Sequence, residues 1–90
     1  MVRVYASPNW DLPTLNVFIA QQENFLRGRL AAISSAGRET MLEFDDSAGV
    51  KPQSNTVVTA SSPPAGAKVV ASNKIIVGNT PVFAIAYRRE

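Results

Sequence analysis

The side chains in this sequence that could carry chemistry are carboxylates, arginines and hydroxyls, because the chain contains no histidine and no cysteine. Histidine is the usual general base, and cysteine supplies the thiolate nucleophile. Ser34-Ser35 and Ser61-Ser62 have no base at a recognisable spacing and are typical of caps and loops. Gly49-Val50-Lys51-Pro52 lacks the glycine spacing and the hydroxyl of a phosphate loop. The sequence therefore predicts a protein that is not an enzyme and that uses no cofactor and no small-molecule substrate.

The acidic residues of the middle segment raise the question of a metal site. Glu43, Asp45 and Asp46 lie close enough in sequence to hold a divalent cation or to act as paired carboxylates. A calcium loop, however, needs more oxygen ligands at stricter spacing and a glycine at its turn. The pattern favours a charged strand end that keeps the chain soluble and blocks edge pairing, and it predicts no metal.

The arginines support an alternative function in nucleic-acid binding. Arg27 and Arg29 are two residues apart, so they would share a face on a strand but diverge on a helix. With Arg38 they could line a basic surface, and Tyr5 or Trp10 could stack on bases. The net charge is only +2 and no cluster of four bases occurs, which favours surface charges that serve solubility.

The longest element that could position these residues is a helix from Asp11 to Ser34 or Ser35. Asp11 is a suitable N-cap, Pro13 is tolerated in the first turn, and Gly37 would end the helix. A mostly apolar row of residues recurs there at three- and four-residue steps, as on one side of a helix: Leu15, Phe18, Ile19, Gln22, Phe25, Leu26, Arg29, Leu30 and Ile33.

Gly28 lies inside this helix and permits a second interpretation, because glycine costs about 1 kcal/mol relative to alanine in a helix. In that version the helix ends near Asn24, residues 26–34 form a strand, and the chain turns into a strand at 39–44. The pattern Gly28-x-Leu30-x-x-Ile33, a turn and Met41-Leu42 resembles small Sm-like or SH3-like barrels. Under this version Arg27 and Arg29 align.

Period-two alternation and β-branched residues predict further strands at residues 2–5, 39–44, 56–59, 68–77 and 81–88. Gly78-Asn79-Thr80 between the last two is the strongest hairpin signal. The sequence thus predicts an α+β fold: one domain over residues 1–90, with one long amphipathic helix on a mostly antiparallel sheet of about five strands. The alternative is a short helix with a small SH3/Sm-like β-barrel. The element order is similar to cystatin-like folds, but their glutamine–valine–glycine loop is missing.

The last strand is apolar on both sides, which is typical of a strand covered on both faces. Phe83, Ile85 and Tyr87 alternate with smaller residues, and small side chains let a second layer approach closely. We therefore expect a protein–protein interface there, with Trp10 as a further candidate anchor. The alternative for Trp10 is a hydrophobic plug that closes one end of the core and packs near Thr14 or Leu15. The predicted interface residues of the last strand are Val82, Ala84 and Ala86, with Arg88 and Arg89 at the rim.

The composition also predicts a protein partner, either another copy of the chain or a neighbouring subunit. Only 18% of residues are charged, so much of a small surface is left neutral or apolar. Acidic residues gather at 39–46, between basic flanks, which suits a subunit that meets copies of itself or neighbouring subunits. No signal peptide and no membrane-spanning run is recognisable, so we expect a cytoplasmic or virion location. Short cysteine-free chains with Ser/Pro/Ala/Gly loops are similar in composition to virion decoration, neck or tail proteins.

Overall fold

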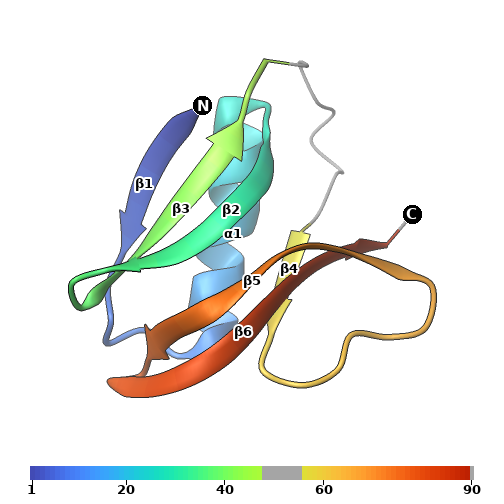
Figure 1. The fold of residues 1–90 in the computed structure, drawn as a ribbon. Helices are drawn as coiled ribbons and strands as arrows, with labels where there is room; N and C mark the ends of the chain where they lie inside the picture. Colours follow the sequence, from blue (N-terminus) through green and yellow to red (C-terminus); the bar gives the residue numbers. More distant parts are fainter. Residues whose placement is uncertain (48–55, 90) are drawn as a thin grey trace.

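The computed structural model describes residues 1–47 and 56–89, and for Arg89 the backbone only. It confirms the predicted α+β class, and these residues form one helix and two three-stranded antiparallel sheets. Sheet A has the order β1-β3-β2, and sheet B has the order β4-β6-β5. In Figure 1 the two sheets lie side by side and α1 lies behind them. The elements are β1 (Val2–Ala6), α1 (Leu12–Leu26), β2 (Arg29–Ala36), β3 (Glu39–Asp45), β4 (Thr56–Thr59), β5 (Ala67–Val77) and β6 (Thr80–Arg89).

The start of α1 confirms the predicted cap. Asp11 is the N-cap residue, and its Oδ1 accepts a hydrogen bond from the Thr14 backbone N–H at 3.0 Å. Hydrogen bonds from the side chain and the backbone of Thr14 lower the pKa of Asp11. Among the described residues, no helix has the length and apolar character that crossing a membrane requires.

The end of α1 differs from the longer helix favoured by the sequence. The helix stops at Leu26, and Arg27 adopts the left-handed conformation that closes it, with φ 52° and ψ 45°. The second half of the apolar row belongs to β2. A β-bulge between Leu30 and Ala32 brings Leu30 opposite Phe44 and Ile33 opposite Leu42, so both face the core. Because the bulge adds one residue, a strand here reproduces the three-residue spacing of a helix.

Gly28 explains why the chain changes direction at this point. A Cβ placed on Gly28 would lie 2.6 Å from the Asp45 carbonyl oxygen and 2.9 Å from the Asp46 Cα, and both are backbone atoms. No larger residue fits unless the backbone of the β3 end moves. The residue therefore allows the helix end to contact the β3 end closely, and β2 begins one residue later.

The predicted hairpin near the C-terminus is confirmed. Gly78 and Asn79 have positive φ values of 57° and 63°, as a two-residue type I′ turn requires. The turn is fixed to the start of the helix: the Gly78 N–H donates to the Trp10 carbonyl at 2.8 Å, and the Asn79 N–H donates to the Pro8 carbonyl at 2.9 Å. The β5–β6 turn and the segment before α1 therefore hold each other in place.

The two sheets meet along β2 and β5, and we call this junction the seam. No backbone ladder crosses the seam, since each of these strands pairs only within its own sheet. Two side-chain bonds cross the seam. Ser35 Oγ donates to the Lys74 carbonyl at 2.8 Å, and Asn73 Nδ2 donates to the Ile33 carbonyl at 3.3 Å. Together the sheets form a curved surface around one core, to which helix and sheets both contribute: Ala6, Leu15, Ile19, Leu30, Ile33, Leu42, Phe44, Val58, Ile75, Ala84 and Ala86.

We expect Gly28→Ala to destabilise the fold by about 1–3 kcal/mol, because its Cβ meets backbone that cannot rotate away. Urea unfolding followed by circular dichroism measures this free energy. Gly37→Ala is the matched control: its Cβ meets nothing within 4 Å, so only its φ of +63° carries a cost, about 1 kcal/mol. Equal stability of Gly28→Ala and the unmodified chain would contradict the close contact.

Candidate interaction surface

Two buried polar residues, Glu23 and Thr56, form a closed ring of hydrogen bonds with Leu30 and Arg88, which we call the Glu23 ring. Glu23 is 3% exposed, and its Oε2 accepts from the Leu30 N–H at 2.8 Å and from Thr56 Oγ1 at 2.6 Å. Its Oε1 accepts from the Thr56 N–H at 3.0 Å. Arg88 completes the ring, because its Nη2 donates to the Leu30 carbonyl at 2.7 Å and its Nε donates to Thr56 Oγ1 at 3.2 Å. The ring connects α1, β2, β4 and β6.

A buried carboxylate is also the natural place to look for catalysis. In the Glu23 ring, however, both carboxylate oxygens already accept donors from the protein, and the side chain is almost entirely removed from solvent. A general base must reach a proton on a substrate in an accessible position. The geometry of Glu23 therefore suits the joining of four elements. Arg88, which the sequence places at an interface rim, belongs to this internal ring.

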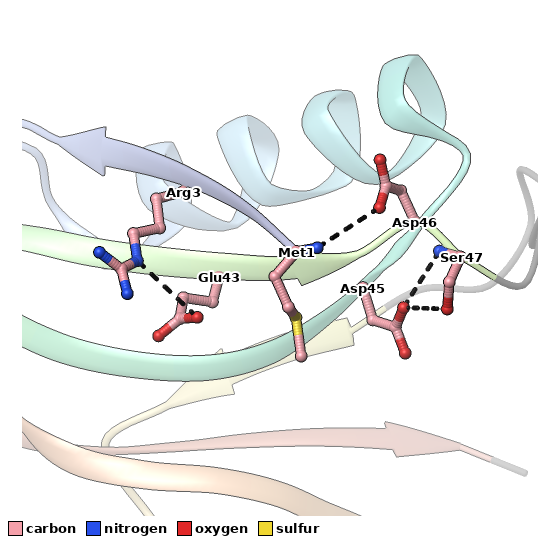
Figure 2. A network of polar contacts seen from close by, with 6 residues as sticks. All are labelled: Met1, Arg3, Glu43, Asp45, Asp46 and Ser47. Carbon is pink, nitrogen blue, oxygen red and sulfur yellow. Dashed lines mark hydrogen bonds and ion pairs between the residues drawn. The ribbon is translucent and has the colours of Figure 1, made fainter.

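The carboxylates predicted to crowd the β3 end lie in separate contacts, which Figure 2 shows. Glu43 pairs with Arg3 of β1 at 3.9 Å, and Asp46 pairs with the amino group of Met1 at 3.8 Å. Asp45 Oδ1 accepts from the Ser47 hydroxyl at 2.6 Å and from its N–H at 3.1 Å, and these bonds lower the pKa of Asp45. Within residues 1–47 and 56–89, no three His, Cys, Asp or Glu side chains are grouped to hold a metal ion.

The outer edge of β4 is covered by side chains of α1. Asn16 Nδ2 donates to the Val58 carbonyl at 2.9 Å, and Asn16 Oδ1 accepts from the Val58 N–H at 2.7 Å. Two helical turns further on, Glu23 accepts the Thr56 N–H. Asn16 and Glu23 thus satisfy the backbone groups that a neighbouring strand would otherwise pair with, and this edge is closed.

The predicted interface on β6 divides into a buried face and an exposed face. Ala84 and Ala86 have no exposed surface in the single chain, and Val82 is half-buried on the same side. The alanines therefore pack against the core of the same chain. A partner of the folded chain would contact the opposite side of β6. Trp10 is half-buried and packs against Phe18, with ring centroids 4.9 Å apart. The side chain of Arg89 lies outside the described residues.

The opposite side of sheet B carries a continuous set of apolar side chains. Phe83 is 60% exposed, and Ile85 and Tyr87 follow it at alternate positions on the same side of β6. The register places Tyr87 between Val57 of β4 and Val69 of β5, both exposed. We call this set the sheet B face: Val57, Val69, Phe83, Ile85 and Tyr87.

The charge around the sheet B face has one sign. Lys74 lies opposite Phe83 in the register, and Lys68 lies at the far end of β5. Residues 56–89 contain no aspartate and no glutamate. Sequence alternation reveals that Phe83, Ile85 and Tyr87 share a side, but the alignment with Val57 and Val69 depends on the register and on the β5 bulge between Val69 and Ala71.

The three arginines of the predicted nucleic-acid surface are exposed but lie apart. Arg27 closes α1, and Arg29 begins β2 opposite Asp45. Arg38 lies in the β2–β3 turn, at the other end of the hairpin. Tyr5, 49% exposed, lies on the outer face of sheet A opposite Met41. The structure therefore does not bring Arg27, Arg29 and Arg38 together into one patch.

We expect Glu23→Gln to lower the free energy of unfolding by about 1–3 kcal/mol, although the side chains have the same shape. Whichever way the amide is turned, its NH₂ group faces an N–H donor of Leu30 or Thr56, and that donor loses its acceptor. Glu39→Gln makes the same charge change at an exposed position, where we expect less than about 0.5 kcal/mol. Equal urea midpoints for the two variants would contradict the role of the ring.

No protein-family model matches the chain, and neither the curated proteins nor the solved structures contain a match. The Glu23 ring, the strand edges and the sheet B face are therefore the features of the chain that bear on its function.

Proposed function

We propose that the chain is a non-enzymatic structural subunit that associates with further copies of itself through the sheet B face. The exposed apolar side chains on three adjacent strands support this most directly. Phe83 is 60% exposed near the hairpin end of the central strand, and Val57 and Val69, 37% and 50% exposed, flank Tyr87 further along it. Contiguous exposed apolar groups are uncommon on monomeric soluble proteins and mark contact surfaces. Larger assemblies, such as a virus particle, are built from contacts of this kind.

Charge supports a second copy of the same chain as the partner. The strands of sheet B carry bases without acids, whereas β3 of sheet A and the residue after it carry Glu39, Glu43, Asp45 and Asp46. Glu43 and Asp46 are paired within the chain with Arg3 and the Met1 amino group, so Glu39 and Asp45 are the acids that could meet the bases at the border of another copy's sheet B face. A contact between two different surfaces of the same chain is heterologous and builds rings or filaments.

Binding of single-stranded nucleic acid is the second candidate, and one observation favours it. Phe83 and Tyr87 lie on the central strand of a sheet whose charged residues are basic, and exposed aromatic rings on a sheet can stack on bases. The rest of the sheet B face is aliphatic, from Val57, Val69 and Ile85. Aliphatic side chains suit an apolar protein surface better than base stacking, so self-association is the stronger proposal.

We expect Phe83→Glu to abolish or strongly weaken association through the sheet B face, and so to lower the mass at a given concentration while leaving the fold intact, because it places a carboxylate on that face. Light scattering and sedimentation over a range of concentrations measure the mass. Phe25→Glu is the matched control, since Phe25 is 82% exposed but lies on α1, outside the face. We expect that variant to associate like the unmodified chain.

A clean monomer at high micromolar concentration would contradict self-association, as would equal effects of Phe83→Glu and Phe25→Glu. Filter binding of single-stranded DNA and RNA at low salt tests the second candidate. Retention that is lost in Phe83→Glu, together with a monomeric mass, would replace the first proposal by the second. Added salt should weaken a contact between oppositely charged surfaces of two copies.

A further inference from the structure

The outer edges of the two sheets differ in whether other parts of the chain cover them. This difference indicates a second contact surface. The outer edge of β4 is closed by Asn16 and Glu23. The outer edges of β2 and β5 face each other across the seam. In the described part of the chain, β1 pairs with β3 on one side and forms no hydrogen bond from its other side. Figure 1 shows β1 at the border of the molecule.

The composition of β1 does nothing to prevent pairing. Proteins commonly protect an open edge with proline, lysine, a bulge or a very short strand. The β1 sequence is Val-Arg-Val-Tyr-Ala, which lacks proline and lysine, and its register with β3 runs without a shift. Arg3 is its one charged side chain, and that side chain already lies beside Glu43. Every second residue of β1 therefore presents an N–H and a carbonyl that a further strand can pair with.

We infer that β1 pairs antiparallel with β1 of a second copy around a two-fold axis, which joins two copies of sheet A into one six-stranded sheet. Full overlap of the five residues of β1 with themselves fixes the register. Val4 then lies opposite Val4 of the second copy, and Val2 lies opposite Ala6. Arg3 lies opposite Tyr5.

This register is chemically self-complementary, which is the argument for a second copy as the partner. Arg3 never opposes the Arg3 of the other copy, so no like charges meet directly. Arg3 meets Tyr5, which is 49% exposed in the single chain, and a guanidinium over a phenol ring is a favourable cation–π pair. Glu43 lies next to Arg3 on β3 and adds its negative charge on the same outer face. Val2 and Val4, half-buried in the single chain, gain cover from their counterparts.

The absence of cysteine from the chain allows a direct test of the register. Arg3→Cys and Tyr5→Cys are made separately, since both side chains are exposed, and the two variants are mixed under mild oxidation. Directly opposite residues have Cβ atoms about 4.5–5.5 Å apart, whereas diagonal neighbours are about 7–8 Å apart. We expect the mixture to give disulfide-linked dimers several times faster than either variant alone. Ser34→Cys, on the same face of sheet A but on β2, is the control for random collision and should link slowly with every variant.

A second measurement covers the case in which cysteine disturbs the contact. Tyr5→Lys places a lysine opposite Arg3 of the other copy, whereas Ser34→Lys adds the same charge away from the edge. Hydrogen exchange of the β1 amides should slow with protein concentration in the unmodified chain and in Ser34→Lys, and should not depend on concentration in Tyr5→Lys. Equal cross-linking of all cysteine pairs, or exchange in β1 that never depends on concentration, would overturn the inference.

The edge contact does not rest on the sheet B face, and the two can fail separately. In Phe83→Glu we expect the Arg3→Cys and Tyr5→Cys cross-link to persist, because β1 and β6 belong to different sheets. Loss of the cross-link in Phe83→Glu, with the fold intact, would show that only the sheet B face drives association and would overturn the edge contact. Cross-linking without any effect of Phe83→Glu on mass would leave the edge contact standing and remove the proposed function of the sheet B face.

Discussion

The structure depends on the need to satisfy one buried carboxylate. Removing an ionised carboxylate from water is costly unless hydrogen-bond donors surround it. Glu23 meets this need with donors from Leu30 and Thr56, and Arg88 closes the ring. Four elements must therefore arrive together at one point. The end of α1, the start of β2, the start of β4 and the end of β6 are all positioned by the same set of bonds.

Several features of the fold could be predicted because their causes are local. Asp11 caps the helix with its own first turn, and Gly78-Asn79 supplies the two positive φ values of a tight hairpin. The end of the helix could not be read in this way. The bulge between Leu30 and Ala32 gives a strand the spacing of a helix, and the reason for Gly28 is backbone from β3. The Glu23 ring could not be predicted from the sequence either, because residues bonded to each other in it are up to 58 positions apart along the chain.

The candidate surface shows the same division between local and distant causes. Alternation in the last strand correctly indicates one face of small residues and one of large residues. Which face meets the core depends on what lies above the strand, and here Ala84 and Ala86 are covered by the chain itself. That assignment leaves Phe83, Ile85 and Tyr87 facing outward beside Val57 and Val69. The β2–β3 hairpin, in turn, places Arg38 at the opposite end from Arg27 and Arg29.

The seam between β2 and β5 has a mechanical consequence for any array built from this chain. The open edge of β1 belongs to sheet A, and the apolar face belongs to sheet B, so the angle between the two contacts passes through the seam. Side-chain bonds from Ser35 and Asn73 cross it in place of a backbone ladder. A small rotation at this joint would strain these bonds and those of the Glu23 ring, in which Arg88 of sheet B donates to Leu30 of sheet A, but it would strain no ladder. The curvature of the array would then depend on a few side chains, the Ser35 hydroxyl and the Asn73 amide among them, which single substitutions can change while both contact surfaces stay the same.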